Sequence, residues 1–126
     1  MPSFIKIIAL LVLVAHGLIH FMGTTVYMKL GKIPDFSYKT TLLNGSWNLG
    51  ESGIRFFGAL WIFPAVGFIV IGIALLMGWS WWQSALVPVT LCSLVLTSLD
   101  WDISFAGVVL NIAILLLVRS SPHILV

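Results

Sequence analysis

Four long apolar runs constrain the fold of this chain more than any other feature. They cover residues 3–24, 52–77, 80–99 and 103–119. Each is close to the roughly 20 residues that a helix needs to cross the hydrocarbon core of a bilayer. Lipid cannot satisfy backbone groups, and continuous apolar runs do not fit a barrel of alternating strands. The sequence therefore predicts an all-α, polytopic membrane protein, with residues 1–126 forming a single four-transmembrane-helix bundle.

The composition excludes the other broad classes of protein. Of the 126 residues, 60% are hydrophobic and only 8% are charged, whereas a soluble domain has about 25% charged residues. The six basic residues are spread along the chain and do not form the clustered patch of a nucleic-acid-binding protein. Cys92 is the only cysteine, so an internal disulfide is excluded. The lipid bilayer is the expected partner, and no nucleic acid is expected.

The connections between the runs predict an orientation in the cell membrane. Residues 25–51 form a long polar loop, whereas the two later connections are tight turns around Gly78 and Asp100. Basic residues in short loops favour the cytoplasmic side. The loop face carries Lys29, Lys32, Lys39 and Arg55, and the opposite face carries Lys6 and Arg119. The multi-pass chain is therefore predicted to have its polar loop in the cytoplasm and both termini outside.

Each run carries polar or small side chains three or four residues apart, which places them on one helix face. In the second run, Gly58, Ala65 and Gly72 recur at seven-residue steps. Small residues at that period predict a close approach of a neighbouring helix. Pro64 and Pro88 fall within the second and third runs and are expected to kink those helices.

The polar side chains converge at one end of the predicted bundle. The up-and-down order of the helices places His20, Glu51 and Asp100 near the polar loop, with His16 and Asn111 one or two turns deeper. Polar groups inside a membrane usually face the protein interior. The sequence therefore predicts a ligand-binding pocket at this end. Its predicted residues are His16, His20, Glu51, Arg55, Ser93, Thr97, Asp100 and Asn111.

The histidine pair leaves several chemistries open. Imidazoles at positions i and i+4 can hold one metal ion, with Glu51 or Asp100 supplying a carboxylate. A single histidine can also ligate a haem or a chlorophyll-type pigment when a partner subunit supplies the rest. The alternative is that His16 and His20 each bond a hydroxyl or a carbonyl on a neighbouring helix. Glu51 and Arg55 are expected to form an ion pair four residues apart.

Two short motifs resemble a known group of proteins. Residues 16–20 read His-Gly-Leu-Ile-His, and residues 51–55 read Glu-Ser-Gly-Ile-Arg. This pattern is similar to that of small prokaryotic four-helix membrane proteins with an H-G-x-x-H first helix, which are loosely DoxX-like. The resemblance covers the layout of most of the chain but only these motifs in detail. It implies a redox or quinone-linked setting and no particular catalytic residue.

Three functions follow from these observations. The first is a small membrane binding protein or accessory subunit, beside a larger membrane complex or in a homo-oligomer, that holds a small ligand, a metal ion, a pigment or a quinone. The second is a membrane-embedded enzyme that uses His16, His20, Glu51 and Asp100 in acid–base or metal chemistry. The third is proton or ion transport through an oligomer, because the far half of a single bundle is apolar. Whether the chain is an enzyme stays open at this stage.

Overall fold

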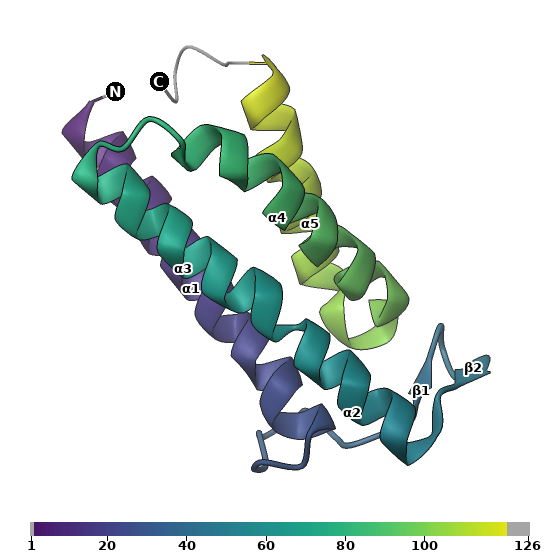
Figure 1. Ribbon diagram of the computed structural model, residues 1–126. Coiled ribbons are helices and arrows are strands. Elements are labelled where there is room, and N and C mark those ends of the chain that lie inside the picture. The colour runs from purple at the N-terminus through teal and green to yellow at the C-terminus, as the bar shows by residue number, and fades with distance from the viewer. Residues whose placement is uncertain (1, 121–126) are drawn as a thin grey trace.

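The computed structural model describes residues 2–120 and shows an all-α bundle of four apolar spans (Figure 1). The helices are α1 Ser3–Tyr27, α2 Gly50–Leu60, α3 Ile62–Met77, α4 Trp82–Leu99 and α5 Trp101–Ser120. α2 and α3 follow each other directly and act as one span, Gly50–Met77. The polar connection between α1 and α2 contains two short antiparallel strands, β1 Thr41–Leu42 and β2 Trp47–Asn48. Four helical segments are long and apolar enough to cross a membrane, so the predicted fold class is confirmed.

The spans run up and down, so chemically different connections lie at opposite ends of the molecule. The start of α1, the α3–α4 turn and the end of α5 lie at one end, called here the terminal end (Figure 1). The α4–α5 turn and the connection at residues 28–49, called here the loop, lie at the other end. Around the bundle, α1 packs on α3, α3 on α4, and α4 on α5.

Most helix boundaries lie within three residues of the predicted ones, and three departures from the predicted helices bear on the site. α1 continues to Tyr27 instead of ending at residue 24, because Tyr27 is buried in the core at the loop end. The second span is interrupted at Trp61, since Pro64 lacks an N–H and its ring crowds the backbone one turn earlier. α5 begins directly after Asp100 and is kinked at Ser104, where the backbone leaves helical geometry (φ −105°, ψ 21°).

Glycines bring the backbones of α1, α2 and α3 close together. A Cβ atom on Gly17 would lie 2.7 Å from the carbonyl oxygen of Ala65, and one on Gly58 would lie 2.8 Å from the Cβ of Tyr27. Gly72 likewise faces side chains of α1. These contacts confirm the prediction that the stripe of small residues in the second run allows a close helix approach.

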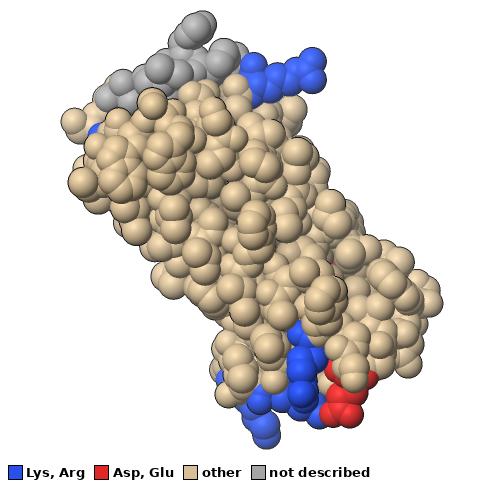
Figure 2. Space-filling view, in the orientation of Figure 1, with Lys and Arg blue, Asp and Glu red and all other residues tan. Residues whose placement is uncertain are grey.

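The core divides into two clusters of different composition. The terminal-end cluster is mainly aliphatic and includes Leu13, Ile71 and Leu86. The loop-end cluster is rich in aromatic rings and includes Tyr27, Phe57 and Trp61. The outer surface is apolar, and on the described part of the face in Figure 2 charged side chains lie only at the two ends. This surface suits contact with lipid along the whole length of the spans.

Candidate functional site

A closed circuit of hydrogen bonds joins three helices at the centre of the bundle. We call it the histidine network, formed by His16 and His20 of α1, Ser93 of α4 and Asn111 of α5. His16 Nε2 lies 2.9 Å from Asn111 Oδ1, and Asn111 Nδ2 lies 2.8 Å from Ser93 Oγ. Ser93 Oγ lies 2.6 Å from His20 Nε2, and His20 Nδ1 lies 2.7 Å from the backbone oxygen of His16. All four side chains are buried.

The partners of this network determine where each proton lies. A carbonyl oxygen only accepts, so Nδ1–H of His20 donates to the His16 carbonyl, and Nε2 of a neutral His20 accepts from the Ser93 hydroxyl. Ser93 Oγ then accepts from the amide of Asn111, which leaves Asn111 Oδ1 to accept from Nε2–H of His16. Every contact pairs one donor with one acceptor. The network is therefore satisfied without any charge, which is the favourable arrangement inside a membrane.

Thr97 completes the polar centre on α4. Its hydroxyl donates to the backbone oxygen of Ser93 at 2.8 Å, and Asn111 Nδ2 lies 3.3 Å from the same hydroxyl oxygen. The structure thus brings together five of the predicted pocket residues. These are His16, His20, Ser93, Thr97 and Asn111.

Asp100 is fully buried but belongs to a second polar cluster at the loop end. The Tyr27 hydroxyl donates to Asp100 Oδ2, and Lys39 Nζ lies 2.7 Å from Asp100 Oδ1 and 3.0 Å from Asp102 Oδ1. Partial burial lowers the pKa of Lys39, but the two carboxylates outweigh this effect, so the net pKa is raised. We call Tyr27, Lys39, Asp100 and Asp102 the loop clamp, because they fasten the loop to the α4–α5 turn. Among the described residues, Asp100 makes no hydrogen bond or ion pair with His16 or His20.

Glu51 and Arg55 lie on the surface, away from the histidine network. Glu51 pairs with Lys29 at 2.8 Å, and both side chains are largely exposed. The predicted ion pair between Glu51 and Arg55 is therefore wrong, because Glu51 pairs with Lys29 instead. α1 is longer than predicted, so Lys29 follows it closely enough to reach the start of α2. The hydrogen bond to Glu51 raises the pKa of Lys29.

The metal hypothesis lacks its third ligand. Among residues 2–120, no group of three or more His, Cys, Asp or Glu side chains is arranged to hold a metal ion. Both ring nitrogens of His20 are engaged within the network. His16 has one engaged nitrogen, and its Nδ1 makes no hydrogen bond to the described part of the chain. A lone pair on His16 Nδ1 is therefore available as a hydrogen-bond acceptor.

A cavity of about 240 Å³ opens beside the network, between α1 and α5. We call it the seam pocket and define it by six of its lining residues. These are His16, His20, Phe36, Trp61, Thr97 and Gly107. A second cavity of about 240 Å³, lined mainly by aliphatic side chains, lies between the same two helices toward the terminal end. The boundary between α1 and α5, called here the seam, is therefore hollowed on both sides of the His16–Asn111 hydrogen bond.

The two cavities are separated by about one helical turn. On α1, the last residue of the apolar cavity is Leu13 and the first of the seam pocket is His16. On α5, which runs in the opposite direction, the seam pocket ends at Leu110 and the apolar cavity begins at Ile114. Asn111 spans this short interval with its bond to His16. The cavities thus follow one groove along α1 and α5.

Trp61 is a pocket residue that the sequence reasoning missed. Its ring centroid lies 5.1 Å from that of His20. Its Nε1 is buried and has no hydrogen-bond partner in the described residues. Helical spacing could have identified Trp61, because it lies three residues after Gly58 and four before Ala65, on the same helix face. A Cβ on Gly23 would lie 3.0 Å from the indole, so α1 leaves room for this ring.

Comparison with protein-family models, curated proteins and solved structures finds no match for this chain. The resemblance to DoxX-like proteins therefore stays a prediction, and the function is argued from the site alone.

Proposed function

We propose that this protein binds a small lipophilic molecule with a planar, oxygen-bearing head group, of the quinone class, which enters from the bilayer through the seam. One observation carries the proposal: the unpaired Nε1–H of Trp61, a residue in the wall of an otherwise largely apolar pocket. A buried N–H without a partner destabilises a fold by about 1–3 kcal/mol. A ligand carbonyl that accepts from Trp61 would remove this penalty.

The chemistry of the pocket wall suits such a head group. Trp61 and His20 provide adjacent ring systems, and flat rings pack well against one another in offset or tilted geometry. Trp61 can donate to a carbonyl oxygen, whereas Nδ1 of His16 can accept from a hydroxyl. The oxidised form of a quinone offers the first group and the reduced form offers the second. The pair of side chains therefore fits both redox forms.

The size of the pocket also supports a small head group. Pockets for drug-sized ligands measure roughly 300–1,000 Å³, and the seam pocket holds about 240 Å³. A single substituted ring suits this volume better than a haem or chlorophyll macrocycle. The aliphatic cavity one turn further along the seam offers a path for an apolar tail.

The enzyme and transport alternatives receive less support from the geometry. The enzyme hypothesis needs Glu51 or Asp100 beside the histidines, but Glu51 is bound by Lys29 on the surface and Asp100 belongs to the loop clamp. Transport needs a polar path to both faces. The terminal-end core is instead packed with apolar side chains such as Leu13, Ile71 and Leu86.

Binding is tested with the full chain in lipid nanodiscs, by calorimetric titration with a short-tailed benzoquinone. Trp61→Phe keeps an aromatic ring but removes the N–H, and we expect it to weaken binding about three- to tenfold. Ala106→Phe places a ring in the pocket from an exposed position on α5 and should abolish binding. Val109→Phe adds the same ring to the lipid face of α5 and is the matched control. Equal heats for Ala106→Phe and Val109→Phe would mean that the quinone only partitions into lipid, and the proposal would fail.

We also infer that the loop lies on the cytoplasmic side. Support comes from the basic residues at the loop end, which outnumber Lys6 and Arg119 at the terminal end. The test uses Ser37→Cys in a Cys92→Ala background, with a membrane-impermeant thiol reagent applied to intact cells. We expect labelling only after the membrane is broken. Labelling of intact cells would reverse the orientation.

A further inference from the structure

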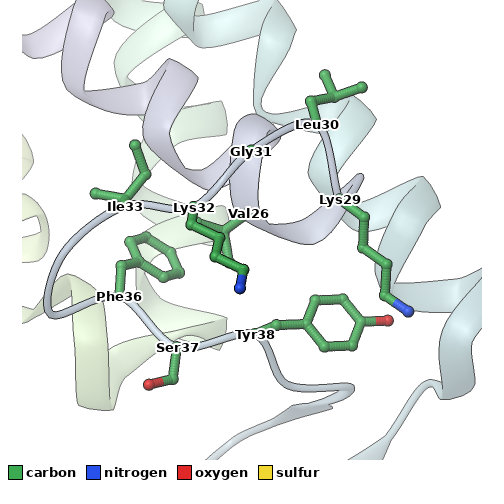
Figure 3. A pocket seen from close by; sticks show the side chains of 9 residues that line it. All are labelled: Val26, Lys29, Leu30, Gly31, Lys32, Ile33, Phe36, Ser37 and Tyr38. Atoms are coloured by element: carbon green, nitrogen blue, oxygen red, sulfur yellow. The ribbon is translucent and has the colours of Figure 1, made fainter.

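A third cavity, of about 620 Å³, lies outside the spans, where the chain leaves α1 and enters the loop (Figure 3). We call it the loop pocket and define it by six of its lining residues. These are Val26, Lys29, Leu30, Lys32, Phe36 and Tyr38. Neither the histidine network nor the proposed quinone-class ligand uses this cavity, although Phe36 also lines the seam pocket. Its ligand chemistry has to be inferred from its own walls.

The two lysines of the loop pocket differ in whether a carboxylate neutralises them. Lys29 Nζ is held by Glu51 at 2.8 Å and lies 4.6 Å from the centre of the Tyr38 ring. The ammonium group of Lys32 points into the middle of the pocket (Figure 3). Within residues 2–120, Lys32 makes no ion pair of its own. The pocket therefore presents one fixed cation and one cation that lacks a counter-charge.

Apart from the hydroxyl groups of Ser37 and Tyr38, the rest of the loop pocket is apolar. Val26, Ile33 and Phe36 contribute hydrocarbon surface, and Leu30 is 70% exposed just beyond the end of α1. α1 is a membrane span that ends at Tyr27, so these side chains lie near the level of the lipid head groups. A small hydrated anion gains nothing from such walls. A molecule that carries a negative charge next to hydrocarbon matches both parts of the pocket.

We propose that the loop pocket binds the phosphate of an anionic glycerophospholipid, with Lys32 as its main cation. Basic pockets at membrane interfaces favour anionic head groups through charge attraction. The lipid phosphate accepts from the Lys32 ammonium, and the upper parts of the acyl chains lie against the exposed side chain of Leu30. This proposal is independent of the quinone-class ligand, since the two pockets share only the ring of Phe36.

The test measures lipid binding to the full chain by native mass spectrometry from detergent, with phosphatidylglycerol and phosphatidylcholine offered in equal amounts. We expect a clear preference for phosphatidylglycerol, reduced about fivefold by Lys32→Gln. Arg55→Gln removes an exposed cation at the same end of the molecule but outside the pocket, and we expect less than about a twofold change. Lys32 is exposed, so its replacement should leave the helical circular dichroism unchanged.

Three outcomes would overturn the proposal. Equal losses for Lys32→Gln and Arg55→Gln would reduce the effect to general attraction by surface charge. Equal binding of the two lipids would remove the anionic preference. Displacement of the lipid by inorganic phosphate at comparable concentration would indicate a site for a free anion. None of these outcomes bears on quinone binding in the seam pocket, so the two proposals fail separately.

Discussion

α1 meets its neighbours in two contrasting ways. Against α2 and α3 its backbone approaches closely, with no room for a Cβ on Gly17 or Gly58. Against α5 it leaves two cavities, and the hydrogen bond between His16 and Asn111 crosses the seam in the interval between them. Close backbone packing fixes the first contact, whereas a hydrogen bond that can be broken and remade holds the second. The proposed ligand would therefore enter through the seam, and the α1–α3 contact would stay closed.

The largest effect is expected from filling the close contact. Gly17→Val places a branched side chain where a Cβ already lies 2.7 Å from a backbone oxygen, and should lower the free energy of unfolding by about 3 kcal/mol. Reversible unfolding in mixed micelles measures this change. Gly72→Ala is the graded control, because the nearest atoms to its Cβ are side-chain atoms of Val14 and Leu10, at 3.2 and 3.3 Å, and not backbone. It should cost less than about 1 kcal/mol. Equal costs would show that the α1–α3 contact is looser than described.

The second-largest loss of stability is expected from removing a carboxylate of the loop clamp. Asp100→Asn removes a buried charge that binds Tyr27 and Lys39 and should destabilise the fold by about 2 kcal/mol. The loss is limited to this size because Lys39 is partly exposed and keeps its ion pair with Asp102. Hydrogen exchange should rise in the loop and stay unchanged in α3. Asp102→Asn, at a 42% exposed side chain, should cost less than about 0.5 kcal/mol. A larger loss for Asp102→Asn than for Asp100→Asn would contradict the assignment of the clamp.

A smaller effect is expected from removing the hydrogen bond between His16 and Asn111 that crosses the seam. Asn111→Leu leaves His16 and Ser93 without their amide partner. Hydrogen bonds between membrane helices contribute roughly 1 kcal/mol, and we expect a loss of that size in unfolding measurements. Hydrogen exchange should increase along α5 more than along α3. Uniform changes in all helices would mean that the seam is not a separate weak boundary.

The smallest effect is a pH dependence of the loop clamp. The pKa of Lys39 in the folded protein lies above the ordinary value of 10.5. Its contribution, under about 1 kcal/mol, is therefore complete below that pH and is lost as the pH rises through the folded pKa. The difference in unfolding free energy between wild type and Lys39→Gln should be constant near neutral pH and shrink above 10.5. A difference that grows with rising pH would have the wrong sign for this assignment.

Helical spacing was enough to predict the spans and the polar centre. His16, His20, Ser93 and Asn111 were all placed on inward faces by their three- and four-residue steps, because such spacing is a local property of a helix. The partners of Asp100 could not be found in this way. Tyr27 lies 73 residues earlier in the chain, and Lys39 approaches only because the loop folds back on the α4–α5 turn. Contacts of that kind depend on the path of the loop.

The site residues outside the network were harder to predict for two different reasons. Glu51 was assigned the wrong partner because the last turn of α1 was not foreseen, and that turn carries Lys29 into reach. Trp61 was overlooked because a tryptophan in an apolar run is usually packing, although its spacing matched the stripe of small residues. The seam pocket itself depends on which helices stay apart, and hydropathy contains no information on that.

Phe36 has a consequence for how the two proposed ligands would affect each other. Its ring forms part of the wall of both the loop pocket and the seam pocket. A lipid that shifted this ring would change the affinity for the intramembrane molecule, and thermodynamic linkage requires that molecule to change the affinity for the lipid by the same factor. If both proposed ligands bind, one aromatic side chain would couple a site at the leaflet surface to a site in the interior of the membrane.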